Sequence, residues 1–243
     1  MLEDYTVIDL EMTGLNAKTD AIIETGAVRV RGGEITATCG ELLFTGRRLP
    51  EKITELTGIT PDMVKAGRDP KEAMEEFFEF LGEDILVGQN VIFDYSFLKQ
   101  WAVNHAFSFE RTAVDTLKLA RKFLPSEQKK DLANLCGYFG IARARAHRAL
   151  DDAVETFRIM EQLKARFGAD HAEAFMPQPL HYQAKKQTPA TGRQLEYLRR
   201  YAAHYGIKLS ELENEMTRSE ASRLADRLIA QYGRLPAHPQ DEK

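Results

Sequence analysis

The 243-residue chain is 43% hydrophobic and 29% charged, which is ordinary for a soluble globular protein of one core plus a small extra module. Its net charge of −4 argues against a protein that wraps a long duplex and favours contact with only a few phosphates. No apolar run is long enough to cross a bilayer and the N-terminus lacks a secretory signal, so we expect a cytoplasmic protein without membrane contact.

The first part of the chain predicts a strand meander followed by a helix. The strands are expected at residues 5–10, 21–30 and 34–43, which are rich in Val, Ile and Thr. The pair Gly32-Gly33 is a hairpin signal between the last two strands. Apolar periodicity after Pro70 predicts a helix over residues 71–81.

The middle of the chain alternates between strand and helix patterns. We expect a strand over residues 84–88, a helix over 93–105, a strand over 112–115 leading into a helix that ends near 125, and helices over 131–139 and 148–167. A meander followed by alternating helices and strands predicts an α/β fold, in which a mixed sheet is flanked by helices.

The last part of the chain changes in character. Prolines interrupt residues 169–190, which predicts a linker. Helical spacing returns over residues 191–233, where we expect a small accessory module, followed by a disordered tail over 234–243. Residues 1–176 carry a charge of −7 and the remainder carries +3, so the module lies in the basic part of the chain.

The basic side chains of the module are compatible with three roles. They could bind a nucleic-acid backbone, form the solvated side of a small bundle, or belong to a helix pair that docks a polymerase or helicase partner. These residues are Arg193, Arg199, Arg200, Lys208, Arg218, Arg223 and Arg227.

Four carboxylates embedded in apolar runs point to a metal site. Asp9 and Glu11 are separated by one residue in a predicted strand, so their side chains share a face. Asp94 follows another apolar segment, and Asp152 lies at the start of the long helical pattern. Adjacent carboxylates repel one another unless a cation lies between them, and oxygen ligands favour Mg²⁺ or Mn²⁺.

Three segments, Asp9–Leu15, Gln89–Asp94 and His147–Asp152, resemble in order and spacing the motifs of the DEDDh 3′–5′ exonucleases. This family includes the proofreading epsilon subunit of bacterial DNA polymerase III. The resemblance covers residues 1–168 and implies a ribonuclease H-like fold with an exonuclease activity. It also implies single-stranded nucleic acid or a 3′ end as the binding partner.

The resemblance implies a role for each motif residue. Asp9, Glu11, Asp94 and Asp152 would hold two Mg²⁺ or Mn²⁺ ions, and His147 would be the general base. The substrate-binding residues would be Thr13, Gly14, Leu15, Asn90, Phe93 and Arg148. A further hypothesis is that Arg143, Arg145 and Arg148 steer phosphates toward the site.

Some alternatives stay open. Asp151 competes with Asp152 as a ligand, although the family spacing selects Asp152. Gln89 stands where the family usually has histidine, which puts in doubt a role for that side chain in orienting substrate. We expect DNA to be the substrate, with trimming of RNA 3′ ends as the alternative activity. The alternative that is not an enzyme is a catalytically inactive adaptor that binds nucleic acid.

Overall fold

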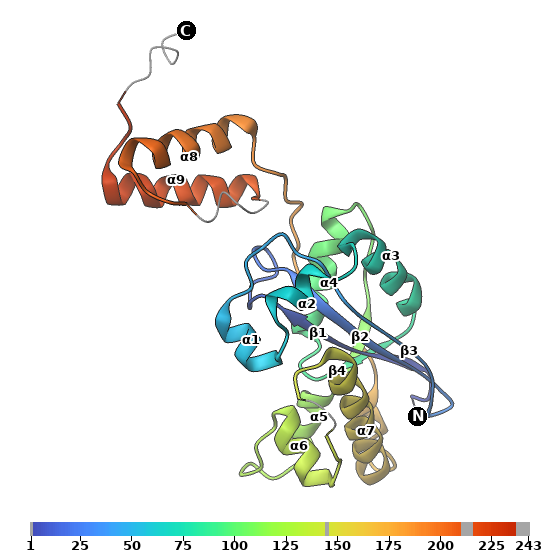
Figure 1. Cartoon of the computed structure of the whole chain (residues 1–243). Helices are drawn as coiled ribbons and strands as arrows, with labels where there is room; N and C mark the ends of the chain where they lie inside the picture. Colours follow the sequence, from blue (N-terminus) through green and yellow to red (C-terminus); the bar gives the residue numbers. More distant parts are fainter. Residues whose placement is uncertain (1, 144–145, 210–215, 237–243) are drawn as a thin grey trace. The chain divides into compact units, whose positions relative to one another are not determined.

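The structure is a computed structural model in which residues 2–143, 146–209 and 216–236 are described. The chain forms two compact units, residues 1–184 and residues 185–243, which are coloured by sequence in Figure 1. Within the described ranges, no helix is long and apolar enough to cross a membrane.

A mixed six-stranded sheet lies at the centre of the first unit (Figure 1). Its strands are β1 (Tyr5–Met12), β2 (Ile22–Arg31), β3 (Glu34–Leu42), β4 (Leu86–Gly88), β5 (Thr112–Asp115) and β6 (Gln178–Pro179), in the spatial order β3-β2-β1-β4-β5-β6. The first three strands are antiparallel, whereas β4 is parallel to β1 and β5 is parallel to β4. Gly32 and Gly33 have φ values of 58° and 79°, so the predicted tight hairpin joins β2 to β3.

Helices cover both faces of this sheet. They are α3 (Pro70–Leu81), α4 (Ile92–Asn104), α5 (Thr116–Phe123), α6 (Leu132–Phe139) and α7 (Ala149–Phe167). One hydrophobic cluster packs α3 and α4 against Ile8 and Leu10 of β1, and another packs α5, α6 and α7 against Val7 on the opposite face. Since strand side chains alternate, Asp9 and Glu11 share the α7 face with Val7.

The predicted strands and the five helices above form within a few residues of their expected limits. The sequence does not predict the short helices α1 (Glu51–Thr57) and α2 (Pro61–Lys65), because one or two turns carry too little apolar periodicity. They pack against the sheet through a small cluster that includes Ile53 of α1, Val64 of α2 and Ile23 of β2.

The expected linker over residues 169–190 is wrong in its first part. This stretch contains the 3₁₀ helix η1 (Ala172–Phe175) and β6, which pairs with β5, and Phe175 and Leu180 are buried. A two-residue edge strand is held by backbone hydrogen bonds to its neighbour, which a sequence pattern does not report. The first unit therefore extends to residue 184.

The second unit contains the helices α8 (Gly192–Tyr205) and α9 (Arg218–Tyr232). Both begin with a capping box, in which Thr191 pairs with Gln194 and Thr217 pairs with Glu220. Their shared core contains Leu198, Tyr201, Ala221, Leu224 and Leu228. Residues 237–243 of the expected tail lie outside the described residues.

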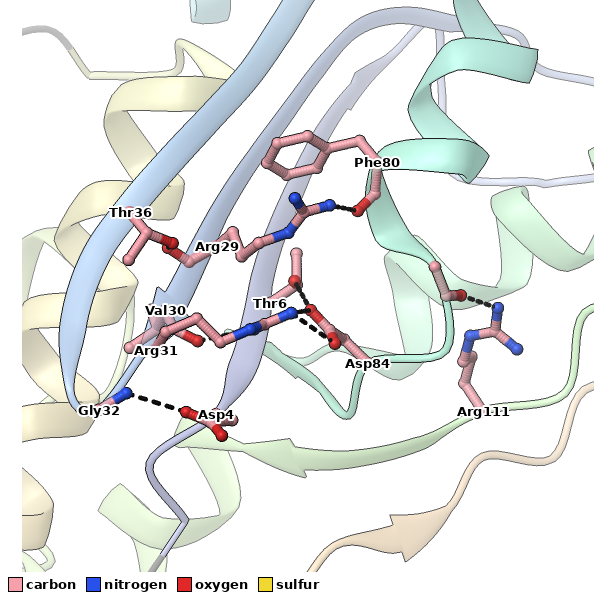
Figure 2. Close-up of polar contacts among 11 residues, drawn as sticks. Asp4, Thr6, Arg29, Val30, Arg31, Gly32, Thr36, Phe80, Asp84 and Arg111 are labelled. Carbon is pink, nitrogen blue, oxygen red and sulfur yellow. Dashed lines mark hydrogen bonds and ion pairs between the residues drawn. The ribbon is translucent and has the colours of Figure 1, made fainter.

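A polar network fixes the N-terminal end of β1 (Figure 2). Asp84 accepts hydrogen bonds from Arg31 Nη2 at 2.7 and 2.9 Å and from Thr6 Oγ1 at 2.6 Å. Arg29 donates to the carbonyl of Phe80 and lies 4.3 Å from the centroid of its ring. These contacts tie the β1–β2 ladder to the segment between α3 and β4, and so hold β1 in place at the end away from its acidic residues.

Candidate active site

Two carboxylates of β1 lie on the face that α7 covers. Across the β1–β2 ladder, Asp9 is opposite Gly26 and Glu11 is opposite Glu24. A Cβ added to Gly26 would lie 2.2 Å from the backbone carbonyl carbon of Ala149, a distance that real structures do not allow. The glycine therefore lets the first turn of α7 approach the sheet beside Asp9.

Asp94 reaches the site from the first turn of α4 and is only 5% exposed. Its Oδ1 accepts a hydrogen bond from the backbone N–H of Leu10 at 3.0 Å, so the carboxylate lies against the strand between the two acids of β1. The turn before α4 depends on Asn90, which has a φ of 62°, a conformation that asparagine tolerates better than most residues. The Asn90 N–H donates to Asp115 Oδ1 at 3.0 Å, which holds this turn to the end of β5.

Asp152 and His147 come from the start of α7 and from the loop before it. Asp152 lies in the first turn and is 4% exposed, and His147 has a φ of 57°. One ligand atom from each of Glu11, His147 and Asp152 lies within 4.8 Å of the other two. The fold thus brings the first and third motifs together as a group that one cation could bind.

Burial and mutual repulsion raise the pKa values of the carboxyl groups. The pKa of Asp9 lies well above its ordinary value because the group is desolvated and faces Asp94, Asp152 and Glu11. Desolvation also raises the pKa of Glu11 to about 8 and that of Asp94 to about 7. A divalent cation would favour the ionised forms, and a donor set of four carboxylates fits Mg²⁺ or Mn²⁺.

Glu24 is a site residue that the sequence analysis misses. Its carboxylate accepts from Arg148 Nη2 at 2.6 Å and Nε at 2.9 Å, and from the backbone N–H of Ala149 at 3.0 Å. The side chain of Arg148, the residue before α7, makes no capping bond to the helix, so Glu24 on β2 satisfies an N-terminal amide instead. The signal was present, because Glu24 is an acid within an apolar strand and follows Ile22 and Ile23.

Arg143, which we expected to steer phosphates toward the site, instead makes ion pairs within the protein. It donates to Asp152 Oδ1 at 2.9 Å and to Glu155 Oε2 at 2.7 Å, and both carboxylates are buried. Arg143 thereby offsets part of the repulsion around Asp152 and holds that side chain in position. Arg145 lies outside the described residues.

Five of the six residues expected to bind substrate lie in the loop after β1, in the turn before α4 or in the first turn of α4, whereas Arg148 lies directly before α7 and pairs with Glu24. The Oγ1 of Thr13 accepts from the N–H of Ala21 at 2.9 Å, which closes the loop on itself. A Cβ on Gly14 would lie 2.5 Å from the Asp20 carboxylate, so the glycine permits this tight packing. Leu15 is 84% exposed, as an apolar side chain that contacts a terminal base would be. Asn90 is exposed and Phe93 is partly exposed.

Gln89, the departure from the family motif, bridges two neighbouring elements. Its Oε1 accepts from Thr116 Oγ1 at 2.5 Å, and its Nε2 donates to the carbonyl of Lys130 at 2.7 Å. These bonds tie the end of β4 to the start of α5 and to the loop before α6. The side chain thus has a structural role in this protein.

Comparison with known proteins agrees with this geometry. Residues 6–160 match the RNase_T family, which is described as exonuclease. The fold is similar to Exonuclease X in complex with 5′ overhanging duplex DNA, with a TM-score of 0.56, 23% identity, and coverage of 70% of this chain and 96% of that one. The first unit therefore has the predicted ribonuclease H-like fold of DEDD exonucleases, and the chain belongs to this exonuclease family.

Two groups of relatives have closer sequences. The DNA polymerase III subunit epsilon of Aquifex aeolicus is 37% identical over 169 residues, which cover 68% of this chain and 84% of that protein. The DNA polymerase III PolC-type of Clostridium perfringens is 36% identical over 159 residues, 65% of this chain but only 11% of that protein. The prediction of a DEDD-type 3′–5′ exonuclease is thus confirmed, and it is the exonuclease region that the chain shares with these relatives.

Replacing Glu24 by Ala should lower both stability and activity. The change leaves the Ala149 N–H and the Arg148 guanidinium without their partner, which costs about 2–3 kcal/mol of unfolding free energy. It should also lower kcat about tenfold or more, because a shift of α7 displaces Asp152. Urea denaturation and a steady-state assay measure the two effects.

The matched control is Glu41→Ala, which removes the carboxylate of an exposed pair with Arg68. Such a pair contributes about 1 kcal/mol or less, and its loss should leave kcat unchanged. Equal effects of the two variants on kcat would refute the anchoring role of Glu24.

The metal-free protein should lose stability as the pH rises from about 4 to 8. The folded-state pKa values of Asp9, Glu11 and Asp94 are raised, so in this range the folded state holds more protons than the unfolded state. This stability is complete below the unfolded-state pKa values and is lost as the pH rises through the folded-state values.

Urea denaturation at several pH values, in EDTA and in Mg²⁺, measures this dependence. A Mg²⁺ concentration of about 100 times its Kd should add about 2.7 kcal/mol at high pH. The Glu11→Gln variant should show a shallower decline with pH in EDTA. A metal-free stability that rises over this range would contradict the raised pKa values.

Proposed function

We propose that the protein removes nucleotides from the 3′ ends of single-stranded or frayed DNA, using two Mg²⁺ or Mn²⁺ ions. The observation that carries this proposal is the convergence of all three acidic motifs at one end of β1, where the carboxylates are buried or half-buried and repel one another. We expect this activity in the cytoplasm.

The residues of the site would divide the work as follows. Asp9, Glu11 and Asp152 would hold one ion and Asp94 would help to hold a second, since the four acids are desolvated and fit hard cations. Bound ions supply an activated water and stabilise the departing oxygen. His147 would take a proton from the attacking water, a task for which the imidazole nitrogen is a suitable acceptor.

DNA is favoured over RNA by what the relatives bind. The epsilon relative is a DNA polymerase subunit, and the structural neighbours include E. coli Exonuclease I in complex with a dT13 oligonucleotide, at a TM-score of 0.59 and 18% identity. Another neighbour is a 3′-exonuclease that recognises a histone mRNA stem-loop, at a TM-score of 0.58. RNA trimming is therefore the alternative that the first assay must address.

The test is a time course with 5′-labelled single-stranded DNA and RNA of the same sequence. We expect a ladder that shortens from the 3′ end in Mg²⁺ or Mn²⁺, stops in EDTA, and runs faster on DNA. Asp9→Ala should reduce the rate by about 10³-fold or more, because the metal site would lose one of its carboxylate ligands. Binding without cleavage in either metal would favour the inactive adaptor, and faster cleavage of RNA would favour the trimming enzyme.

The two neighbouring aspartates at the start of α7 should differ sharply. Asp152→Asn should reduce kcat by about 10³-fold, because Asp152 belongs to the group that can bind a cation. Asp151→Asn is the matched control and should retain most of the activity, since it changes the same charge one position away on the helix. The opposite result would show that the third motif is displaced by one residue.

A further inference from the structure

The second unit lies outside the exonuclease match, which ends at residue 160. Its two helices carry six arginines against three acidic residues, Glu196, Glu220 and Asp226. Glu220 is engaged in the capping box of α9, where its carboxylate accepts from the backbone N–H of Thr217 at 2.8 Å. The helix pair is therefore a basic surface whose chemistry the catalytic site does not explain.

The two helices run parallel, so that both N-termini lie at the same end. Gln194 near the start of α8 donates to Ser222 Oγ at 3.0 Å, near the start of α9. Towards the other end, the Tyr201 hydroxyl donates to the Leu228 carbonyl at 2.9 Å. This arrangement places the positive ends of two helix dipoles side by side.

A groove of about 210 Å³ lies between the helices near that end. It is lined by Arg193, Gln194, Tyr197, Ala221, Ser222 and Ala225. Small side chains on α9 form one side, and the partly exposed Tyr197 ring belongs to the α8 side. The groove is smaller than the roughly 300–1,000 Å³ of a site for a drug-sized ligand, so it suits one unit of a polymer.

Two arginines at this end are available for an anion. Arg193 lines the groove, and Arg218 lies one turn before Ser222 on the same face of α9. Both side chains are exposed, and neither pairs with a carboxylate among the residues that the structure describes. Guanidinium groups next to helix N-termini favour phosphate, and an adjacent tyrosine ring favours a nucleobase.

We propose that this groove binds single-stranded DNA, with a phosphate at Arg193 and Arg218 and a base against Tyr197. A single strand fits better than a duplex, because only an unpaired base can offer a free face to the ring. That the bound strand is the one whose end is cleaved rests on the proposed function. Since the two units share one chain, binding here would raise the effective concentration of substrate at the active site.

The binding test uses the full-length Asp9→Asn protein in EDTA, so that cleavage cannot interfere. Fluorescence anisotropy with a labelled oligothymidylate of about 20 nucleotides would be followed across salt concentrations. Arg193→Ala combined with Arg218→Ala should weaken binding about tenfold at low salt and reduce the salt slope by about 0.7, since one phosphate contact on a single strand contributes about that much.

The matched control is Arg199→Ala combined with Arg223→Ala, which removes the same charge from the same helices away from the groove. Both control residues are exposed. If both double variants lose the same affinity for the oligonucleotide, the loss comes from the change in net charge alone, and the proposed site is wrong. Unchanged affinity in the groove variant would also overturn it, and would leave protein docking as the role of this surface.

A second pair of variants tests the base contact. Tyr197→Leu should weaken binding about fivefold, whereas Tyr197→Phe should retain it, because stacking needs the ring and not the hydroxyl. Thermal unfolding of each variant checks that the second unit is folded. Retained affinity in a folded Tyr197→Leu protein would contradict the stacking contact.

Turnover with Asp9 intact separates this inference from the proposed function. The Arg193 and Arg218 double variant should raise KM about tenfold on the oligonucleotide and leave hydrolysis of p-nitrophenyl thymidine 5′-monophosphate unchanged, since that small ester gains nothing from a second contact. If the unmodified protein hydrolyses neither substrate, the proposed function fails, while the anisotropy result still decides whether the groove binds DNA.

Discussion

The first unit is organised around the repulsion between carboxylates that are buried or half-buried at one end of β1. Six acids gather there from four elements: Asp9, Glu11, Glu24, Asp94, Asp152 and Glu155. Burying unpaired charges costs several kcal/mol each, so this arrangement is stable only if cations or protons balance it. Two arginines supply part of the balance, and burial together with the neighbouring carboxylates raises the pKa values of Asp9 and Glu11.

The placement of the arginines explains where a metal can bind. Arg148, the residue before α7, pairs with Glu24 of β2, and Arg143 pairs with both Asp152 and Glu155 of α7. The pair with Glu24 orients the helix, and the pairs of Arg143 offset part of the negative charge at Asp152, which belongs to the group that could bind a cation. Glu11, His147 and Asp152 keep their ligand atoms close together. A cation bound there would have the most favourable electrostatic interaction with the surrounding carboxylates.

Backbone geometry allows this density of charge. Gly26 removes a side chain where α7 meets the sheet, and the left-handed turn at Asn90 directs Asp94 toward the backbone of Leu10. The network around Asp84 fixes the far end of β1 (Figure 2), so the strand cannot slide to relieve the repulsion. The network at the other end of the sheet thus offsets part of the free energy that the repulsion between the carboxylates costs.

The sequence predicts the features that repeat or that carry chemistry. Alternating Val, Ile and Thr predicts β1 to β3, the Gly32-Gly33 pair predicts the hairpin, and the acids of the motifs stand out from their apolar neighbours. It does not predict the partners of Arg143 and Arg148, because an arginine in a charged loop has the same sequence signature whether it contacts a phosphate or a carboxylate. Glu24 and Gln89 show the same limit, since only the fold reveals that one caps a helix and the other joins two elements.

The distribution of charge links the two units. Residues 1–176 carry −7, and this field opposes the approach of a polyanion until metal ions bind. We expect a catalytic unit of this kind to contact few phosphates of its substrate, and therefore to bind a strand end weakly. If the basic helix pair binds DNA as proposed, it would compensate without adding positive charge to the active site, where such charge would compete with the ions for the carboxylates. In this proposal, separating attraction from catalysis would let the acidic site bind its metals and still retain its substrate.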